Sequence, residues 1–174
     1  MPELVEAVVE DPRWEATGIV AVAERAARAA LEAVGRDPDQ HEIGLLLCDD
    51  AKMAALNAQF RGRAAPTNVL SWPAFPDEVP VPAGDPGEGP TFIGDLALGY
   101  ETCAREAAEA GIGLADHAAH LVVHGVLHLL GHDHQDDAAA EAMEAIETNV
   151  LASMGIPNPY SQKERPSGAA SGQE

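Results

Sequence analysis

The chain has 174 residues, 46% of them apolar, and its 29 acidic and 10 basic residues give a net charge of −19. This length and apolar content predict one domain with its own core. The negative charge argues against broad, nonspecific binding to nucleic acid, so a polyanionic substrate would need a local basic patch. Lys52, Arg61 and Arg63 form such a segment. No long apolar run or signal-peptide pattern is present, which predicts a cytoplasmic protein without membrane contact.

The first half of the chain alternates between short apolar runs and helical periodicity. Strands are predicted over 4–9, 42–48 and 66–73, and a helix over 14–34. A second helix begins at a cap, Asp49 or Asp50, and continues through Phe60. Proline then closes the third strand, and the residues from 73 to 90 are rich in proline, glycine and acids. This predicts an unusually long loop.

The second half adds one strand, over 91–98, and three helices. The first helix spans 101–110, the next begins at Asp116 and is apolar almost all round, and the last is capped by Asp136 or Asp137. We therefore predict an α+β domain over 1–156: a small mixed four-stranded sheet packed with about five helices, with a central buried metal-binding helix. The polar residues 157–174 are predicted to form a disordered tail.

A histidine-rich stretch is the main functional signal, because six of the seven histidines lie between positions 117 and 134. His124 and His128 are four residues apart, which places both imidazoles on one face of a helix. Gly131 can end that helix and turn the chain back, so that His134 approaches the pair. Three histidine ligands leave one tetrahedral position open, as in catalytic zinc sites. We therefore predict one Zn²⁺ ion.

Other polar residues near this motif have alternative roles. His132 and Asp133 lie in the same turn and could replace or support a ligand. His117 and His120 precede the motif on the same side of the helix. They are expected to be a polar extension toward the surface or hydrogen-bond partners of the ligands.

The spacing H-x3-H-x5-H is shared with metzincin peptidases, which carry a general-base glutamate directly after the first histidine. In this chain that position is Gly125. Without this carboxylate, peptide hydrolysis of that type lacks the general base that deprotonates the zinc-bound water. A zinc peptidase is therefore the least favoured interpretation.

Four motifs, in order along the chain, resemble the YbeY family of metal-dependent endoribonucleases in bacterial rRNA maturation. They are L-N-A-Q-F-R at 56–61, T-N-V-L-S-W-P at 67–73, I-G-D-L at 93–96 and H-G-V-L-H-L-L-G-H-D-H at 124–134. The resemblance covers about residues 4–156. Two positions differ from the usual family pattern: Asn68 replaces an aspartate and Trp72 replaces a phenylalanine.

The resemblance implies a single-strand-specific, metal-dependent endoribonuclease acting in 16S rRNA 3′-end processing and ribosome quality control. It implies His124, His128 and His134 as both metal ligands and catalytic residues, and Arg61 as a catalytic arginine. The implied partners are single-stranded rRNA and the small ribosomal subunit or its proteins, not DNA. The general base stays open between water activated by zinc, Asp133 and the RNA's own 2′-hydroxyl. The alternative is a ribosome-assembly or RNA-binding factor with a mainly structural zinc.

Overall fold

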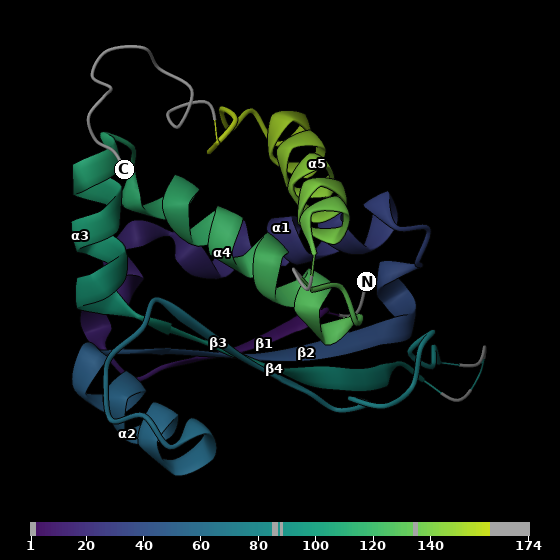
Figure 1. Ribbon diagram of the computed structural model, residues 1–174, viewed down its shortest axis with the longest axis horizontal. Coiled ribbons are helices and arrows are strands. Elements are labelled where there is room, and N and C mark those ends of the chain that lie inside the picture. Colours follow the sequence, from purple (N-terminus) through teal and green to yellow (C-terminus); the bar gives the residue numbers. More distant parts are fainter. Residues whose placement is uncertain (1–2, 85–86, 88, 134–135, 161–174) are drawn as a thin grey trace.

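The computed structural model shows one four-stranded sheet with helices on both faces (Figure 1). It describes residues 3–84, 87, 89–133 and 136–160. The strands are β1 (Val5–Val9), β2 (His41–Cys48), β3 (Val69–Pro73) and β4 (Thr91–Gly99), arranged in the order β1-β2-β4-β3. The first three strands in this order are parallel, and β3 is antiparallel to β4. The predicted mixed four-stranded sheet is confirmed.

Five α-helices and two 3-10 helices occur in the described part of the chain. They are η1 (Pro12–Thr17), α1 (Ile19–Ala33), η2 (Pro38–Gln40), α2 (Asp50–Arg61), α3 (Tyr100–Ala110), α4 (Leu114–Leu129) and α5 (Asp137–Ser153). In Figure 1, α4 runs across one face of the sheet, with α1 and α5 packed on it, whereas α2 lies on the opposite face. The predicted α+β class and buried central helix are therefore confirmed. No described helix is long and apolar enough to span a membrane.

The prediction of a single helix over 14–34 is wrong at its N-terminal end. The chain forms η1 and then α1, separated by Gly18 with φ of +71°. Trp14, on η1, is fully buried and donates its indole N–H to the carbonyl of Cys48 at 2.9 Å. The apolar periodicity that suggested one helix thus runs across two separate elements.

The other predicted elements are confirmed to within a few residues at their ends. Asp49 and Asp136 are the N-caps of α2 and α5, and each side chain accepts a backbone N–H bond. The residues between β3 and β4 form the predicted long loop, apart from 85, 86 and 88, which lie outside the described residues. Most of the predicted tail, 161–174, also lies outside them. Tyr160, near the tail's start, bonds to Glu147 on α5.

The half-buried Arg36 attaches the long loop to the domain. Arg36 donates to the carbonyl of Val81 at 2.7 Å and lies 3.0 Å from Nε2 of His41. The other ring nitrogen of His41, Nδ1, lies 2.9 Å from the carbonyl of Asp37 and must donate to it. His41 is only 2% exposed. Nε2 must therefore be the unprotonated nitrogen, because it accepts from a guanidinium.

We predict that His41 makes the protein less stable in mild acid. Burial lowers the pKa of His41 from its ordinary 6.5, and the nearby Arg36 also lowers it, against a backbone bond that raises it. Above pH 6.5 the ring is neutral in both states; as pH falls below 6.5 the unfolded chain takes up the proton first, so stability falls until the folded-state pKa is passed. Urea midpoints measured across this range should fall more for the native protein than for His41→Gln. Parallel curves for the two proteins would contradict the assignment.

Candidate functional site

Helix α4 carries four histidines in one stripe and apolar residues on its remaining surface. The stripe consists of His117, His120, His124 and His128, separated by three, four and four residues. Consecutive imidazole centroids are 6.4, 6.4 and 4.5 Å apart. The buried remainder includes Leu121, Val122, Val126 and Leu127. The apolar surface fixes the helix in the core and so leaves only the histidine face to approach the surface.

His124 and His128 converge at their Nε2 atoms, which lie 3.0 Å apart. Two nitrogens bound to one tetrahedral Zn²⁺, each at about 2.0–2.1 Å, would be separated by about 3.3 Å. Nδ1 of His124 lies 2.6 Å from a carboxylate oxygen of Glu147 on α5. A proton on Nδ1 leaves the lone pair of Nε2 for a ligand, which is the arrangement that carboxylates impose on metal-binding histidines.

Glu147 is fully buried and accepts bonds from three side chains. One oxygen accepts from His124; the other lies 3.0 Å from Nε2 of His120 and also accepts from the hydroxyl of Tyr160. Burial by itself raises the pKa of Glu147, but bonds from His120, His124 and Tyr160 outweigh it and lower the pKa to about 2. The carboxylate is therefore charged, and the imidazoles must be its donors.

The chain reverses directly after α4, as predicted. Gly131 has φ of +98°, and the N–H of His132 bonds back to the carbonyl of Leu127 at 3.0 Å. His134, the predicted third ligand, lies outside the described residues. Among the residues that are described, no three histidine, cysteine, aspartate or glutamate side chains come close enough to hold a metal.

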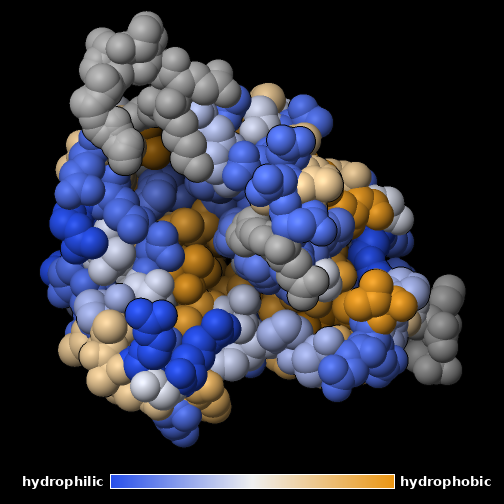
Figure 2. All heavy atoms as spheres, in the orientation of Figure 1, coloured by the Kyte–Doolittle hydropathy of each residue, from blue (hydrophilic) through white to orange (hydrophobic). Residues whose placement is uncertain are grey.

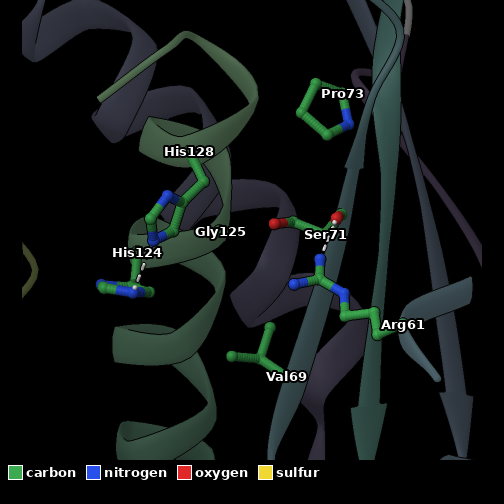
Figure 3. Close-up of a pocket in the computed structure, with 7 residues that line it drawn as sticks. All are labelled: Arg61, Val69, Ser71, Pro73, His124, Gly125 and His128. Atoms are coloured by element: carbon green, nitrogen blue, oxygen red, sulfur yellow. Dashed lines mark hydrogen bonds between the residues drawn. The ribbon is translucent and has the colours of Figure 1, made fainter. Parts of the chain in front are cut away.

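Arg61 lies across a pocket from the two histidines (Figure 3). It is the last residue of α2, and its guanidinium donates to the carbonyl of Ser71 on β3 at 2.9 Å. The pocket measures about 310 Å³ and is lined by Arg61, Val69, Ser71, Pro73, His124, Gly125 and His128. Three of the four predicted site residues therefore line one pocket, although they come from two separate helices. Figure 2 shows apolar side chains gathered in a hollow on this side of the molecule.

Asn68 belongs to a second polar network beside the pocket. Its amide donates to Glu106 of α3 at 3.0 Å, and the same carboxylate oxygen lies 2.8 Å from Nε2 of His117. An aspartate at position 68 would place a second carboxylate against Glu106. The asparagine thus fits the residue opposite it, and it ties the start of β3 to α3 and α4.

Comparison with known proteins assigns the family. Residues 9–155 match the family described as "Endoribonuclease YbeY". The chain belongs to this family. Curated proteins of the same name include one from Paracoccus denitrificans, 51% identical over 94% of both chains, and one from Dinoroseobacter shibae, 50% identical over 90% of both. The family resemblance seen in the four motifs is thereby confirmed.

A solved structure supports the fold. The solution structure of TM1509 from Thermotoga maritima superposes with a TM-score of 0.57, covering 98% of this chain and 99% of that one. Only 18% of the aligned residues are identical, so this likeness concerns the fold alone.

Sequence reasoning missed Glu147 and Tyr160. A signal for Glu147 was present, because it lies four residues after Met143 and three before Val150, within the apolar stripe of the last helix. A carboxylate at a buried helical position needs hydrogen-bond donors. Tyr160 could not be found this way, because it follows the helix and returns to Glu147 only through the tertiary fold.

Gly125 lies on α4 directly against Leu96 of β4. A Cβ built at this position would lie 2.7 Å from Cδ2 of Leu96, which is 1% exposed and has little room to move. A glutamate at this position, as in metzincin peptidases, would therefore require Leu96 to move.

We predict that Gly125→Ala destabilises the protein by about 1–3 kcal/mol, the usual cost of overfilling a packed core. Gly113→Ala, at the N-cap of the same helix, is the matched control, because nothing lies within 4 Å of the point that its Cβ would occupy. Urea unfolding of both variants should show the larger loss at position 125. Equal losses would mean that the contact with Leu96 yields easily.

Proposed function

We propose that this protein is a zinc-dependent endoribonuclease that cleaves single-stranded rRNA. The relatives named as endoribonucleases support RNA as the substrate. The observation that carries the proposal is the pocket itself, where the guanidinium of Arg61 faces the imidazoles of His124 and His128. A guanidinium and a metal-binding imidazole pair on opposite walls suit a phosphodiester, whose oxygens gain negative charge during cleavage.

The donor set suits one Zn²⁺ ion. His124 and His128 would supply two nitrogens, and we propose His134 as the third ligand. Glu147 would hold His124 in the tautomer that exposes Nε2. Bound zinc would lower the pKa of water to about 7 or polarise a phosphoryl oxygen.

Arg61 would position the phosphate. Its guanidinium has five N–H donors and uses one of its nitrogens on the carbonyl of Ser71. This bond would help to orient the guanidinium, while its other N–H groups can bind two phosphoryl oxygens. Because the arginine ends α2 and the acceptor lies on β3, the two elements together set where the phosphate sits relative to the histidines.

The general base has three candidates: Asp133, the RNA 2′-hydroxyl and activated water. The product ends distinguish them, since a 2′,3′-cyclic phosphate requires attack by the 2′-hydroxyl. A single strand suits the pocket, because a splayed strand exposes its phosphates more than a duplex does.

We further propose a role in 16S rRNA 3′-end maturation and ribosome quality control, in the cytoplasm. The net charge of −19 disfavours unaided binding of RNA. The small ribosomal subunit or one of its proteins would therefore present the substrate.

Arg61→Ala and His128→Ala should both abolish most RNA cleavage, but for different reasons. Loss of a charged contact to the transition state costs about 100-fold or more in rate, while the zinc content of Arg61→Ala should stay native. His128→Ala should lose the metal as well. Arg25→Ala, an exposed arginine on α1 outside the basic segment and the pocket, is the control. Assays would use single-stranded rRNA and casein, with zinc measured by atomic absorption.

Native cleavage by Arg61→Ala would disprove the role given to that residue. Cleavage of casein would indicate a peptidase. Cleavage of neither substrate by the zinc-loaded protein would favour the assembly factor with a structural zinc.

Glu147→Gln should weaken zinc binding by about 10–100-fold, as expected when the partner of a metal-binding histidine loses its charge. Glu141→Gln changes an exposed carboxylate on the same helix and should leave affinity unchanged. Competition with a chromogenic chelator measures both. Equal affinities in the two variants would show that Glu147 does not orient His124.

A further inference from the structure

The outer face of the sheet is only partly covered. Helix α2 packs over its β3 side, where Cys48, Met53, Leu70 and Ala97 form a small buried cluster. Beyond α2 this face has no helix over it in the described part of the chain (Figure 1). A groove of about 720 Å³ remains there, lined mainly by Val8, Leu46, Leu56, Phe60 and Trp72. It is more apolar than the histidine pocket and lies on the opposite face of the sheet.

The strand register explains the shape of this groove. Val8, Leu46, Ala97 and Leu70 form one row of outward side chains across the four strands. The next row consists of Glu6, Gly44, Asp95 and Trp72. Because Gly44 has no side chain, the middle of the second row is hollow, and the carboxylate of Asp95 lies over it. The groove thus has an apolar row beside an acidic row.

Its apolar side chains are unusually accessible. Val8 is 56% exposed and Phe60 is 57% exposed. The ring of Phe60 contacts that of Trp72, with centroids 5.6 Å apart. Trp72 also holds a buried indole N–H that has no acceptor among the described residues. The described residues of the chain therefore leave Val8 and Phe60 exposed in the groove and the indole N–H of Trp72 without an acceptor.

The acidic residues at the rim of the groove are Glu6 and Asp95. Within the described part of the chain, no cationic side chain pairs with Glu6 or Asp95. Desolvation raises the pKa of Asp95, and no neighbouring cation offsets it. A smaller hollow of about 190 Å³ shares Glu6, Gly44 and Asp95 with the groove and adds Glu3, Glu42 and Phe92. The negative charge therefore continues along the sheet.

Charge decides which occupant fits. A nucleic acid or an anionic lipid would bring phosphates against these carboxylates. A second copy of the chain would bring a net charge of −19. The chain's own residues 161–174 carry no large apolar side chain that could fill the groove. A polypeptide segment with bulky apolar residues next to arginine or lysine complements the groove. Its apolar residues would pack against the apolar row, and its cations would pair with the carboxylates of the acidic row.

We propose that the outer sheet face is a docking groove for an apolar, basic polypeptide segment of a partner protein. Apolar side chains bind against Val8, Leu46 and Phe60, and the adjoining cations pair with Glu6 and Asp95. The surface is independent of the proposed RNA cleavage. It shares two elements with the histidine pocket, however, because Phe60 precedes Arg61 and Trp72 follows Ser71.

The test uses a short fluorescent peptide with leucine and phenylalanine in one half and arginine in the other. A second peptide replaces each arginine with glutamate. Fluorescence anisotropy should show binding of the basic peptide only, and amide NMR shifts should map to the outer face of β1, β2 and β4. Val8→Arg should weaken binding by about tenfold or more, equivalent to about 1.4 kcal/mol. Glu6→Arg should do the same through charge.

Val20→Arg is the matched control, since Val20 is 45% exposed on α1, away from the groove. Circular dichroism should show native folding for each variant. The proposal is overturned if the basic peptide does not bind, if its shifts map elsewhere, or if Val8→Arg and Val20→Arg bind alike. Equal binding of the acidic peptide would overturn it as well. So would a concentration-dependent dimer lost in Val8→Arg, because the occupant would then be a second copy.

Discussion

The close approach of α4 to the sheet at Gly125 is the constraint on which the site depends. A Cβ at this position would lie 2.7 Å from Cδ2 of Leu96, so a larger residue would force this packing to shift. The contact brings His124 and His128, on either side of the glycine, up to the β3 edge of the sheet. Arg61 reaches the same edge from the other face, where it bonds to Ser71. A wider separation of helix and sheet would move the imidazoles away from the guanidinium.

Glu147 shows how a buried charge can serve a surface site. Removing a carboxylate from water is costly unless donors replace the lost hydration. Two imidazoles and a phenol supply those donors here, and one of the imidazoles is a residue of the pocket. The same bonds that make the burial tolerable therefore fix the orientation of His124. Because the donors come from α4 and from the segment after α5, this arrangement also links the last helix to the histidine face.

The sheet divides the molecule into two functional faces that share α2 and β3. Alternation along β3 directs Ser71 toward the histidine pocket and Trp72 toward the outer groove. On α2, Phe60 lies in the groove while the neighbouring Arg61 crosses to the pocket. A ligand on the outer face would thus contact the two elements that hold the guanidinium. This gives a short physical route, through adjacent residues, between a docking partner and the pocket.

The sequence by itself determined most secondary structure and the candidate residues of the site. Apolar periodicity, capping aspartates and turn glycines depend only on residues close together in the sequence, so they indicate helices, strands and turns without knowledge of the tertiary structure. The His124–His128 pair follows from helical spacing, and the motif around Arg61 indicated the family. These signals failed at Gly18, where two elements share one apparent period, and they did not indicate the short η2.

Only the tertiary structure decided which distant residues meet. The distance between Arg61 and the histidines depends on how α2, β3 and α4 pack, and no local pattern records that packing. The role of Gly125 is visible only beside Leu96, and the charge of Glu147 only beside its three donors. Local sequence preferences specify elements, whereas the separation between elements is set by side-chain packing across the whole core.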